Sequence, residues 1–593
     1  MAAKGGKEDK GKDQARLEGL LPNAQMGQVC TRFPPEPSGY LHIGHAKAAM
    51  LNNHYAREYQ GRLIVRFDDT NPSKEKMEFE ESIIKDLASL RIVPDIVTHT
   101  SDHFEKLQEI MEDVIKRGLA YCDDTDVAQM REERDKGTPS KCRDQSVEEA
   151  LKIWQEMLKG SKDGLRYCIR GKLDMTSKNK CLRDPVFYRC KVDVPHHRHG
   201  TKYKAYPTYD FACPVVDALE GVTHALRTIE YKDRDDMYKW VQEATKSRTV
   251  ELVEFSKTQF THTVLSKRKL AWFVDNGLVS GWDDPRFPTV RGIARRGLTV
   301  DALLEFVMTQ GMSKATNLME WDKIWAINKQ KIDPIVPRYS AVNEEDVVVL
   351  KLKDGPAEPE SKLDKLHPKN DEMGERLIIL TKEVYLEAED AQVSVDGEQV
   401  TLLHWGNAYL DKVVKNAAGK VTEIEGHLNL EGSVKDTKRK IHWLPKLPDQ
   451  ITPCILRELD HIVTKAKIED DDKIEDIVNH TSIVDTPALG DPLLKTLSPG
   501  DKLQLERRGY FIVDEAAFPP GKPMVLIKIP DGKSTNTGIG AKIDAAKLQG
   551  KDEKGGAAAA KDGGKKDGKE EAKGGKEAKG GKEAKGGKEA KGG

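Results

Sequence analysis

The chain has 593 residues, of which 38% are hydrophobic and 33% charged, and its formal net charge is −2. This length is sufficient for three or four domains, and the sequence contains no run of 18 apolar residues that would predict a membrane span. Because the charges are nearly balanced, an RNA-binding function would have to depend on local basic patches and not on bulk charge.

The cysteines and the N-terminal residues indicate an intracellular protein. Eight cysteines are scattered along the chain without any CxxC pair, which favours reduced thiols in the cytosol over disulfides or a structural zinc site. Residues 1–20 are rich in Lys, Gly and Asp and lack the apolar segment of a secretory signal. We therefore expect a cytoplasmic location without membrane attachment, and a disordered leader over residues 1–26.

The first motif follows a predicted strand at Val29 to Phe33, where glycine and proline predict a sharp turn into a helix. This motif is the tetrapeptide HIGH, in which His42 and His45 stand three residues apart and so share one face of the first helical turn. Two imidazoles beside a helix N-terminus suit a phosphate that gains negative charge during a reaction. By itself, however, such a pair could equally be a metal site or a solvated helix face.

Strands and helices alternate from Val29 to about Ile332. Arg62 to Phe67 has the composition of a short buried strand, and Phe79 to Leu90 carries apolar residues at helical spacing. The alternation predicts a parallel sheet with crossover helices, which is an α/β fold of the Rossmann type.

A second motif lies far downstream, at Val264 to Arg268, and contains the sequence Ser266-Lys267. The flexible side chain of Lys267 could neutralise the far end of a polyphosphate. The alternative is a solvated basic loop, because Arg268 and Lys269 follow directly.

After Asp333-Pro334 the pattern changes to β-branched runs separated by turns, which predicts one or two β-barrels over residues 333–548. The strongest runs are Asp346 to Leu352, Arg376 to Leu380, Glu383 to Ala388 and Met524 to Ile529. Residues 549–593 are a low-complexity tail with KEAKGG repeats, whose paired glycines predict disorder.

The two motifs together resemble the HIGH and KMSKS signatures of class I aminoacyl-tRNA synthetases. In VLSKRKL, Val264 replaces the usual first lysine and Arg268 the last serine, a variant similar to that of the glutamyl/glutaminyl subgroup. The resemblance continues through segments 65–75, 206–227 and 281–297, and covers about residues 27 to 545. It is strongest to the glutamyl members of the archaeal and eukaryotic cytosolic type.

This resemblance implies a domain organisation and an activity. It implies a Rossmann-type catalytic domain over 27–332, an acceptor-end-binding insertion over about 95–208, a helical connector over about 285–332, and β-barrel anticodon-binding domains over 333–548. The implied activity is that of a glutamate–tRNA ligase, which activates L-glutamate with ATP and Mg²⁺ and transfers it to the 3′-terminal adenosine of tRNA(Glu).

The same resemblance assigns the residues that act on ATP. It implies that His42 and His45 stabilise the α-phosphate in the transition state, and that Lys267 holds the leaving β- and γ-phosphates. The ATP-binding set is completed by Gly44, Leu265 and Ser266.

The amino-acid pocket needs an anion for the α-ammonium group and a cation for the side chain. Asp68, at the end of a predicted strand, is placed for the ammonium, whereas its neighbour Asp69 could instead cap the next turn. Arg32 ends the first strand, where its guanidinium could bind a γ-carboxylate in bidentate fashion. Tyr209 resembles the tyrosine with which the family contacts the substrate side chain.

Arg227 discriminates between the two possible amino acids, because the glutaminyl relatives lack this arginine. Glutamine's neutral amide would leave the guanidinium unpaired, at a cost of about 2–5 kcal/mol, which favours glutamate as the substrate. The alternative is a surface ion pair with Glu230 or Asp233.

The resemblance also implies contacts with tRNA. Asp233 matches an acidic residue that reads the acceptor stem, although an ion pair on its own helix is an alternative. Arg338 is a candidate for the third anticodon base and Gln504 for the middle uracil, the alternative being ordinary barrel surface. His196, His197 and His199 with Cys190 lack a second cysteine pair, so we expect no metal site there.

Two other functions stay open at this point. A glutaminyl-tRNA synthetase would share most of these motifs, and a non-catalytic tRNA-binding scaffold could retain the same fold. Association with other synthetases in a larger complex is also left open.

Overall fold

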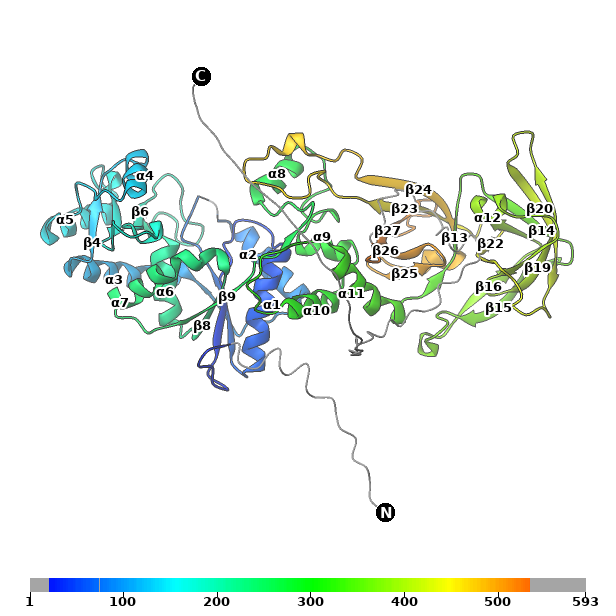
Figure 1. The fold of residues 1–593 in the computed structure, drawn as a ribbon, viewed down its shortest axis with the longest axis horizontal. Helices are drawn as coiled ribbons and strands as arrows, with labels where there is room; N and C mark the ends of the chain where they lie inside the picture. The colour runs from blue at the N-terminus through cyan, green and yellow to red at the C-terminus, as the bar shows by residue number, and fades with distance from the viewer. Residues whose placement is uncertain (1–20, 74, 534–593) are drawn as a thin grey trace, which may run out of the picture. The chain divides into compact units, whose positions relative to one another are not determined.

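The computed structural model describes residues 21–73 and 75–533 of the chain (Figure 1). All of them belong to one compact unit, residues 1–550. Most of the predicted leader and the whole of the predicted tail lie outside the described residues.

A parallel sheet forms the centre of the N-terminal half. It contains the strands β1 (Cys30–Phe33), β2 (Arg62–Phe67) and β3 (Ile96–His99), in that order and all parallel. A second parallel pair, β8 (His224–Thr228) and β9 (Glu251–Phe255), lies next to β1, because Thr223 N donates to Cys30 O at 2.9 Å.

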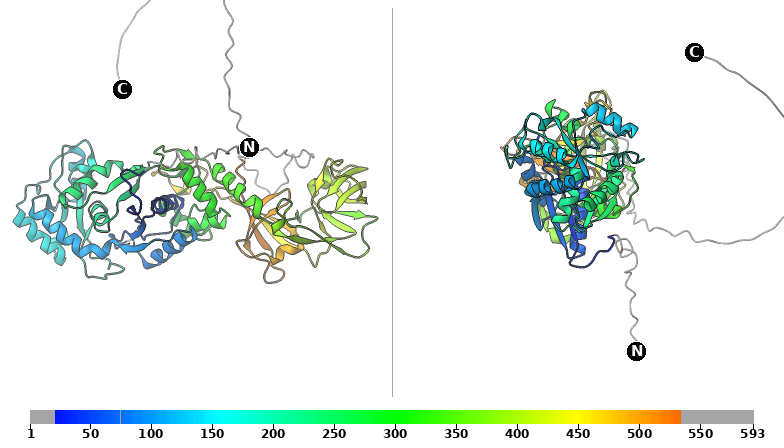
Figure 2. Two further views of the ribbon diagram at one scale, coloured as in Figure 1. Left: turned by 90° about the horizontal axis from the view of Figure 1, so that it is seen from below. Right: turned by 90° about the vertical axis from the view of Figure 1, so that its left-hand side faces the viewer.

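Parallel strands require crossover connections, and helices provide them here. The crossovers are α1 (Ile43–Glu58) between β1 and β2, and α2 (Met77–Ser89) between β2 and β3. Strand β2 is buried from its second residue onward, as expected for a strand covered on both faces. Figure 1 shows α1 beside the strands, and Figure 2 gives two further views. The predicted Rossmann-type α/β fold is therefore confirmed.

A separate antiparallel sheet interrupts this arrangement between β3 and β8. Its strands are β4 (Ala120–Asp123), β5 (Cys168–Gly171), β6 (Val186–Cys190) and β7 (Ala205–Pro207). Its helices are α3 (Phe104–Lys116), α4 (Val127–Lys136) and α5 (Val147–Lys159), and Trp154 on α5 is fully buried in the shared core. Because β3 pairs with β2, residues 96–99 belong to the parallel sheet of β1, β2 and β3. The sequence-based expectation includes them in the insertion over about 95–208.

Helices dominate the segment between β7 and the barrels. They are α6 (Tyr209–Leu219), α7 (Asp235–Ala244), α8 (Lys267–Asp275), α9 (Val290–Arg295), α10 (Val300–Gln310) and α11 (Asp322–Ile332). The last three lie within residues 285–332, for which the sequence predicts a helical connector, and the short strands β10 (Gln259–Phe260) and β11 (Leu318–Met319) form a parallel pair.

The C-terminal half contains two seven-stranded sheets that close on themselves. In the first, β12 (Arg338–Tyr339) and β13 (Ala341–Asn343) stand at opposite ends of the strand order, yet only Ser340 separates them in the chain. In the second, β21 (Lys440–Ile441) and β22 (Trp443–Pro445) stand at the two ends, separated only by His442. Each sheet is therefore joined into a barrel through a single interrupted strand, which removes the exposed edges.

The remaining strands of the first barrel are β23 (Thr452–Leu459), β24 (Ile483–Gly490), β25 (Lys502–Leu505), β26 (Gly509–Glu515) and β27 (Met524–Ile529). Those of the second are β14 (Val348–Leu352), β17 (Glu383–Leu386), β18 (Glu398–Leu402), β19 (Gly406–Lys415) and β20 (Val421–Asn429), and a separate hairpin is formed by β15 (Glu360–Lys365) and β16 (Glu375–Leu380). The four β-branched runs of the sequence all coincide with strands.

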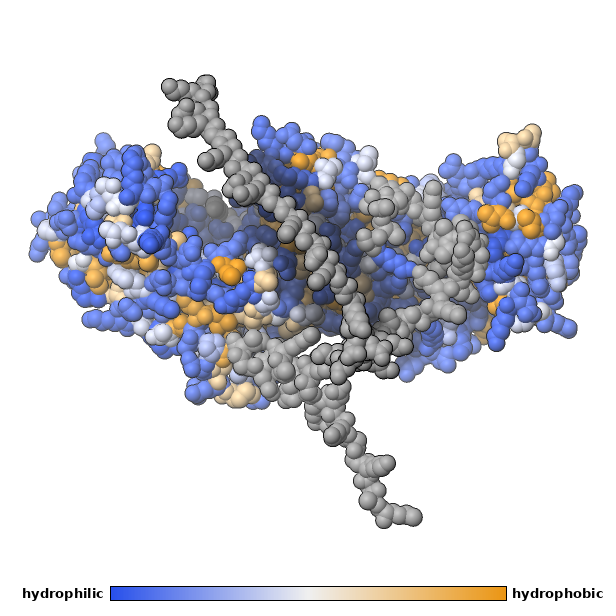
Figure 3. Space-filling model, viewed as in Figure 1, coloured by the Kyte–Doolittle hydropathy of each residue, from blue (hydrophilic) through white to orange (hydrophobic). Residues whose placement is uncertain are grey.

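The face drawn in Figure 3 is mostly hydrophilic, with separated hydrophobic patches. Within the described residues, none of the helices has the length and apolar character needed to cross a membrane.

Candidate active site

The HIGH tetrapeptide forms the start of α1. His42 is the N-cap residue, and its Nδ1 accepts from the backbone N–H of Gly44 at 3.1 Å. The Nδ1 of His45 accepts from the backbone N–H of His42 at 3.2 Å. In a neutral imidazole whose Nδ1 accepts, the proton is on Nε2, so both rings present an N–H donor. The rings stack with their centroids 3.7 Å apart.

Electrostatics keep both imidazoles neutral. Burial and the nearby Lys267 lower the pKa of His42 to about 4. Burial, His42 and Lys267 together hold the pKa of His45 well below its ordinary value. At neutral pH the pair can therefore donate hydrogen bonds to a phosphate, while the positive charge comes from lysine.

Lys267 reaches the HIGH turn in the structure. It is the first residue of α8, and its Nζ donates to Ser38 Oγ at 2.6 Å, in the loop between β1 and α1. A side chain at Gly39 would approach the aliphatic part of Lys267 to 3.3 Å, so the loop and the lysine are in close contact. The two signature motifs thus meet at one site, as the sequence predicts for ATP binding. Leu265 is half-buried just before them and Ser266 is exposed.

The two aspartates after β2 have different environments. Asp68 is half-buried and its Oδ1 accepts from Thr70 Oγ1 at 3.0 Å. Burial raises the pKa of Asp68 to about 6, although the Thr70 hydrogen bond opposes this shift. Asp69 is fully buried and accepts from Ser101 N–H at 2.8 Å and Ser101 Oγ at 2.6 Å. Asp69 is thus structural, but it anchors the chain after β3, whereas the sequence suggests a cap on its own turn.

Arg32 is buried and paired with protein groups. Its Nε lies 3.1 Å from both carboxylate oxygens of Asp217, and its Nη1 donates to Leu226 O at 3.0 Å. Asp217 also accepts from Arg66 Nη2 at 2.5 Å and from Tyr238 OH at 2.7 Å. Burial raises the pKa of Asp217, but the two arginines outweigh it and lower the pKa to about 2.

The sequence alone does not single out Asp217 or Arg66. One signal for Arg66 is its place between apolar residues in the buried part of β2, because a charged residue there must find a buried counter-ion. This network holds Nε and Nη1 of Arg32, whereas the contact of its Nη2 with Cys213 Sγ is long, at 3.8 Å.

Arg227 is different, because it is buried and yet has few partners. Only 5% of the residue is exposed, and its one ion pair with a residue that the structure describes joins Nη1 to Asp235 Oδ1 at 3.5 Å. Its Nε is buried without a hydrogen-bond partner among the described residues. The guanidinium lies over the rings of Tyr231 and Tyr238, at 5.0 and 5.2 Å from their centroids.

The ion pair suggested for Arg227 by the sequence is not formed. Glu230 pairs instead with Lys257 at 2.8 Å, and Asp233 is exposed. The first residue of α6, Tyr209, lines the same small cavity as Arg227. The structure therefore brings Tyr209 and Arg227 together at the ends of β8 and α6.

Arg338 and Gln504 are brought together on neighbouring strands of the first barrel. They are direct partners in the parallel pairing of β12 with β25. Both Arg338 Nε and Gln504 Oε1 are buried without a hydrogen-bond partner in the described part of the chain. The nearest ion pair of Arg338 is a 3.5 Å contact with Asp333. Unsatisfied polar groups on adjacent strands are suited to a ligand with hydrogen-bonding edges.

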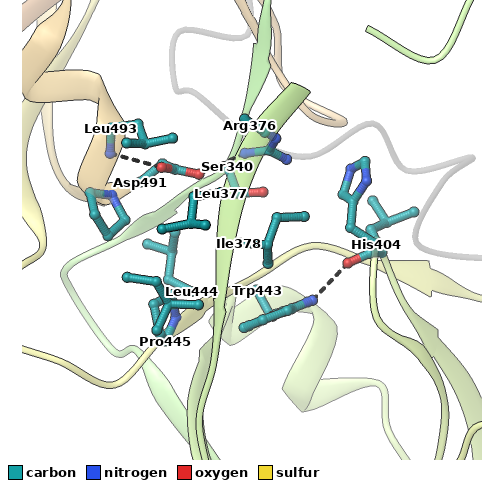
Figure 4. Close-up of a pocket in the computed structure, with 13 residues that line it drawn as sticks. Ser340, Arg376, Leu377, Ile378, His404, Trp443, Leu444, Pro445, Asp491 and Leu493 are labelled. Carbon is teal, nitrogen blue, oxygen red and sulfur yellow. Dashed lines mark hydrogen bonds and ion pairs between the residues drawn. The ribbon is translucent and has the colours of Figure 1, made fainter. Parts of the chain in front are cut away.

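A pocket of about 50 Å³ follows β12 at Ser340 (Figure 4). On one side Arg376 pairs with Asp491 at 2.7 Å, and on the other lie His404 and Trp443. His404 binds Asp364 through Nδ1 and Glu506 through Nε2. Burial disfavours protonation of this ring, but its two carboxylate partners raise the pKa of His404 above its ordinary value.

The remaining candidates lie apart from these sites. The exposed Asp233 accepts at its backbone oxygen from Asn179 Nδ2, at 2.7 Å. Cys190 donates to backbone oxygens of the insertion. His196 and His197 instead lie near Glu75, and the potential ligand atoms of these three residues are within 4.8 Å of one another. The histidines and Cys190 therefore do not assemble into the set considered from the sequence.

Comparisons with known proteins agree with this geometry. The family described as tRNA synthetases class I (E and Q), catalytic domain, matches residues 28–334. Two anti-codon binding domains of the same group match residues 336–430 and 440–514.

Similar full-length proteins come from several eukaryotes. A protein of Arabidopsis thaliana named cytoplasmic glutamate–tRNA ligase is 52% identical over 534 residues, which is 90% of this chain and 73% of that protein. A probable cytoplasmic glutamate–tRNA ligase of Schizosaccharomyces pombe is 51% identical over 516 residues, 87% of this chain and 72% of the relative. A bifunctional glutamate/proline–tRNA ligase of Drosophila melanogaster is 49% identical over 536 residues, 88% of this chain and 31% of that protein.

The doubly paired His404 gives a testable pH dependence. Its pKa is raised on folding, so its stabilising contribution is complete below the unfolded pKa of about 6.5 and is lost as pH rises through the folded value. Urea unfolding of the unmodified protein and of His404→Gln should therefore differ most near about pH 6 and converge at higher pH. A difference that grows with pH would contradict the bridging role.

Proposed function

The chain belongs to the class I tRNA synthetases of the E and Q type, and from this premise we propose that it is a cytoplasmic glutamate–tRNA ligase. It activates L-glutamate with ATP and transfers the glutamyl group to the 3′-terminal adenosine of tRNA(Glu). The names of the similar proteins support the substrate and the location, and the geometry of the site supports the chemistry.

The observation that carries the choice of amino acid is the unsatisfied guanidinium of Arg227. Buried arginines normally have a close carboxylate partner, as Arg32 has in Asp217, whereas within the described residues Arg227 has one 3.5 Å ion pair and an unpartnered Nε. A γ-carboxylate would supply the missing acceptors through a charge-assisted bidentate contact. Glutamine, with a neutral amide, would leave most of that charge unpaired.

Arg32 then has an indirect part in substrate binding. Its guanidinium is held by Asp217 and by Leu226 O, the residue before Arg227 on β8. We assign Arg32 to positioning this strand end and to the positive potential of the pocket, and Tyr209 to contact with the substrate side chain. Asp68 in its ionised form holds the α-ammonium group.

The activation step needs charge stabilisation more than covalent help from the protein. A carboxylate oxygen of glutamate attacks the α-phosphorus, and the bond to the pyrophosphate oxygen breaks. The Nε2–H groups of His42 and His45 donate to the α-phosphate oxygens, on which negative charge develops. Lys267 moves from Ser38 to the leaving β- and γ-phosphates, and Mg²⁺ carried with ATP screens their charge.

The transfer step and tRNA binding involve the other predicted residues. As class I membership implies, the 2′-hydroxyl of the terminal adenosine attacks the glutamyl carbonyl and AMP leaves. The exposed carboxylate of Asp233 is free to accept from a base amino group of the acceptor stem. Gln504 and Arg338, adjacent and unsatisfied, bind unstacked anticodon bases, with Gln504 on the middle uracil and Arg338 on the third base.

The close packing at Gly44 predicts sensitivity to a single methyl group. A Cβ at this position would lie 3.0 Å from the ring of His42, so Gly44→Ala should displace the imidazole from its cap on α1. We expect pyrophosphate exchange to fall by roughly 10-fold or more, with the affinity for tRNA nearly unchanged. Unaltered exchange in a variant with normal thermal stability would rule out the catalytic geometry.

The environment of Asp68 predicts how glutamate binding depends on pH. Its pKa is raised to about 6, and only the ionised carboxylate attracts the substrate ammonium. KM for glutamate should therefore rise as pH falls through about 6, and Asp68→Asn should have a high KM that no longer varies over this interval. The imidazoles of the HIGH turn do not interfere with this measurement, because burial lowers the pKa of His42 to about 4 and holds the pKa of His45 well below its ordinary value.

Arg227 provides the test of the function itself. Arg227→Gln should lower kcat/KM for glutamate by roughly 10²-fold or more and leave the weak activation of glutamine unchanged. The control is Arg131→Gln, which removes an exposed arginine from α4. Pyrophosphate exchange is measured with tRNA present, for each amino acid. If the unmodified protein prefers glutamine, it is a glutaminyl enzyme, and if it shows no exchange, it is a binding scaffold.

A further inference from the structure

Arg227 already has an anionic neighbour, Asp235, whose Oδ1 lies 3.5 Å from its Nη1. We propose that Asp235 is an exchangeable counter-ion, which pairs with Arg227 in the empty site and gives way to the γ-carboxylate of glutamate. This inference rests on the proposed function, and it names Asp235 as a further residue that determines the affinity for glutamate.

The pair has the geometry of a contact that can be exchanged. Asp235 is the first residue of α7 and is 8% exposed, so its carboxylate is largely removed from water. Yet Oδ1 stays 3.5 Å from Arg227 Nη1, longer than the usual 2.7–2.9 Å of a charged hydrogen bond. In the same fold Asp217 binds Arg66 at 2.5 Å and Arg32 at 3.1 Å. Asp217 is thus a permanent partner of its arginines, and Asp235 a loose one.

A second cation, Lys232, can pair with Asp235 when Arg227 binds the substrate. Lys232 Nζ lies 3.2 Å from Asp235 Oδ2 and 2.6 Å from Glu254 Oε1 on β9. Glu254 is itself held by Lys314 at 2.7 Å. The displaced carboxylate therefore stays paired inside the site. Burial and a hydrogen bond shared with Glu254 raise the pKa of Asp235, whereas Lys232 and Arg227 oppose this shift.

The exchange has two consequences of opposite sign. In the empty protein, Asp235 partly offsets the cost of a buried guanidinium, so it stabilises the fold. During binding it competes with the substrate, so it weakens the affinity for glutamate. Glutamine cannot replace an anion, so its affinity should not depend on this competition.

The decisive variant is Asp235→Asn, which keeps the shape of the side chain and removes its charge. KM for glutamate should fall by roughly three- to tenfold with kcat within about twofold, and the thermal midpoint should decrease by a few degrees. The parameters for glutamine should stay the same. The matched control is Asp236→Asn, in the same first turn of α7 but exposed, which should change neither KM.

A second variant tests the proposal in the other direction. Lys232→Gln removes a cation whose side chain is 61% accessible, so it should cost less stability than the loss of the buried Asp235. Asp235 then has Arg227 as its remaining close cation, and KM for glutamate should rise by roughly threefold. Both variants are assayed by pyrophosphate exchange at saturating tRNA, because Asp233 lies next to Lys232.

Failure of this proposal is distinguishable from failure of the proposed function. If the unmodified protein prefers glutamine, the function is wrong. If it prefers glutamate but Asp235→Asn leaves KM unchanged or raises it, then Asp235 is a structural partner of Arg227 and the exchange is overturned. An unstable Asp235→Asn together with an unaltered KM in Lys232→Gln overturns it as well.

Discussion

The catalytic half of the molecule depends on one buried carboxylate. Asp217 accepts from Arg32 on β1, from Arg66 on β2 and from Tyr238 on α7, and so ties two strands and a helix to α6. Burying a carboxylate is costly, but two guanidinium groups and a hydroxyl offset the desolvation and keep the charge. Removal of Asp217 would leave Arg32 without its carboxylate partner and Arg66 with Glu220 alone, which destabilises a fold far more than a lost surface pair does.

This network explains why the arginines of the site have different roles. Arg32 and Arg66 are satisfied within the protein and hold strand ends in place. Arg227 lies beside the same network, over the ring of Tyr238 that donates to Asp217, but receives only the loose contact with Asp235. The Asp217 network fixes the surroundings of Arg227, and its own pairing is incomplete. Arg227 is therefore a positioned cation that can still bind an anionic ligand. Gln504 and Arg338 repeat this incomplete pairing in the first barrel.

Much of the molecule follows from local sequence. The apolar strand β2, the amphipathic helices and the β-branched runs coincide with observed elements, because hydrophobic periodicity and turn residues act over short distances. The sequence pattern predicts β-barrels but not how each one closes, because closure depends on a strand that joins both ends of a sheet and is interrupted at Ser340 or at His442. The position of β3 in the parallel sheet likewise depends on its pairing with β2, which is distant in the sequence, so local patterns do not predict it.

The sequence by itself determined the fold class and the two signature motifs, whose residues are close together along the chain and carry their own chemistry. Only the tertiary structure decided how the charges pair. It showed that Lys267 meets the HIGH turn through Ser38, that Arg32 is taken by Asp217, and that Arg227 faces Asp235 instead of Glu230 or Asp233. Pairing of buried charges is set by distance and desolvation across the folded chain, and neither quantity can be read from residue spacing.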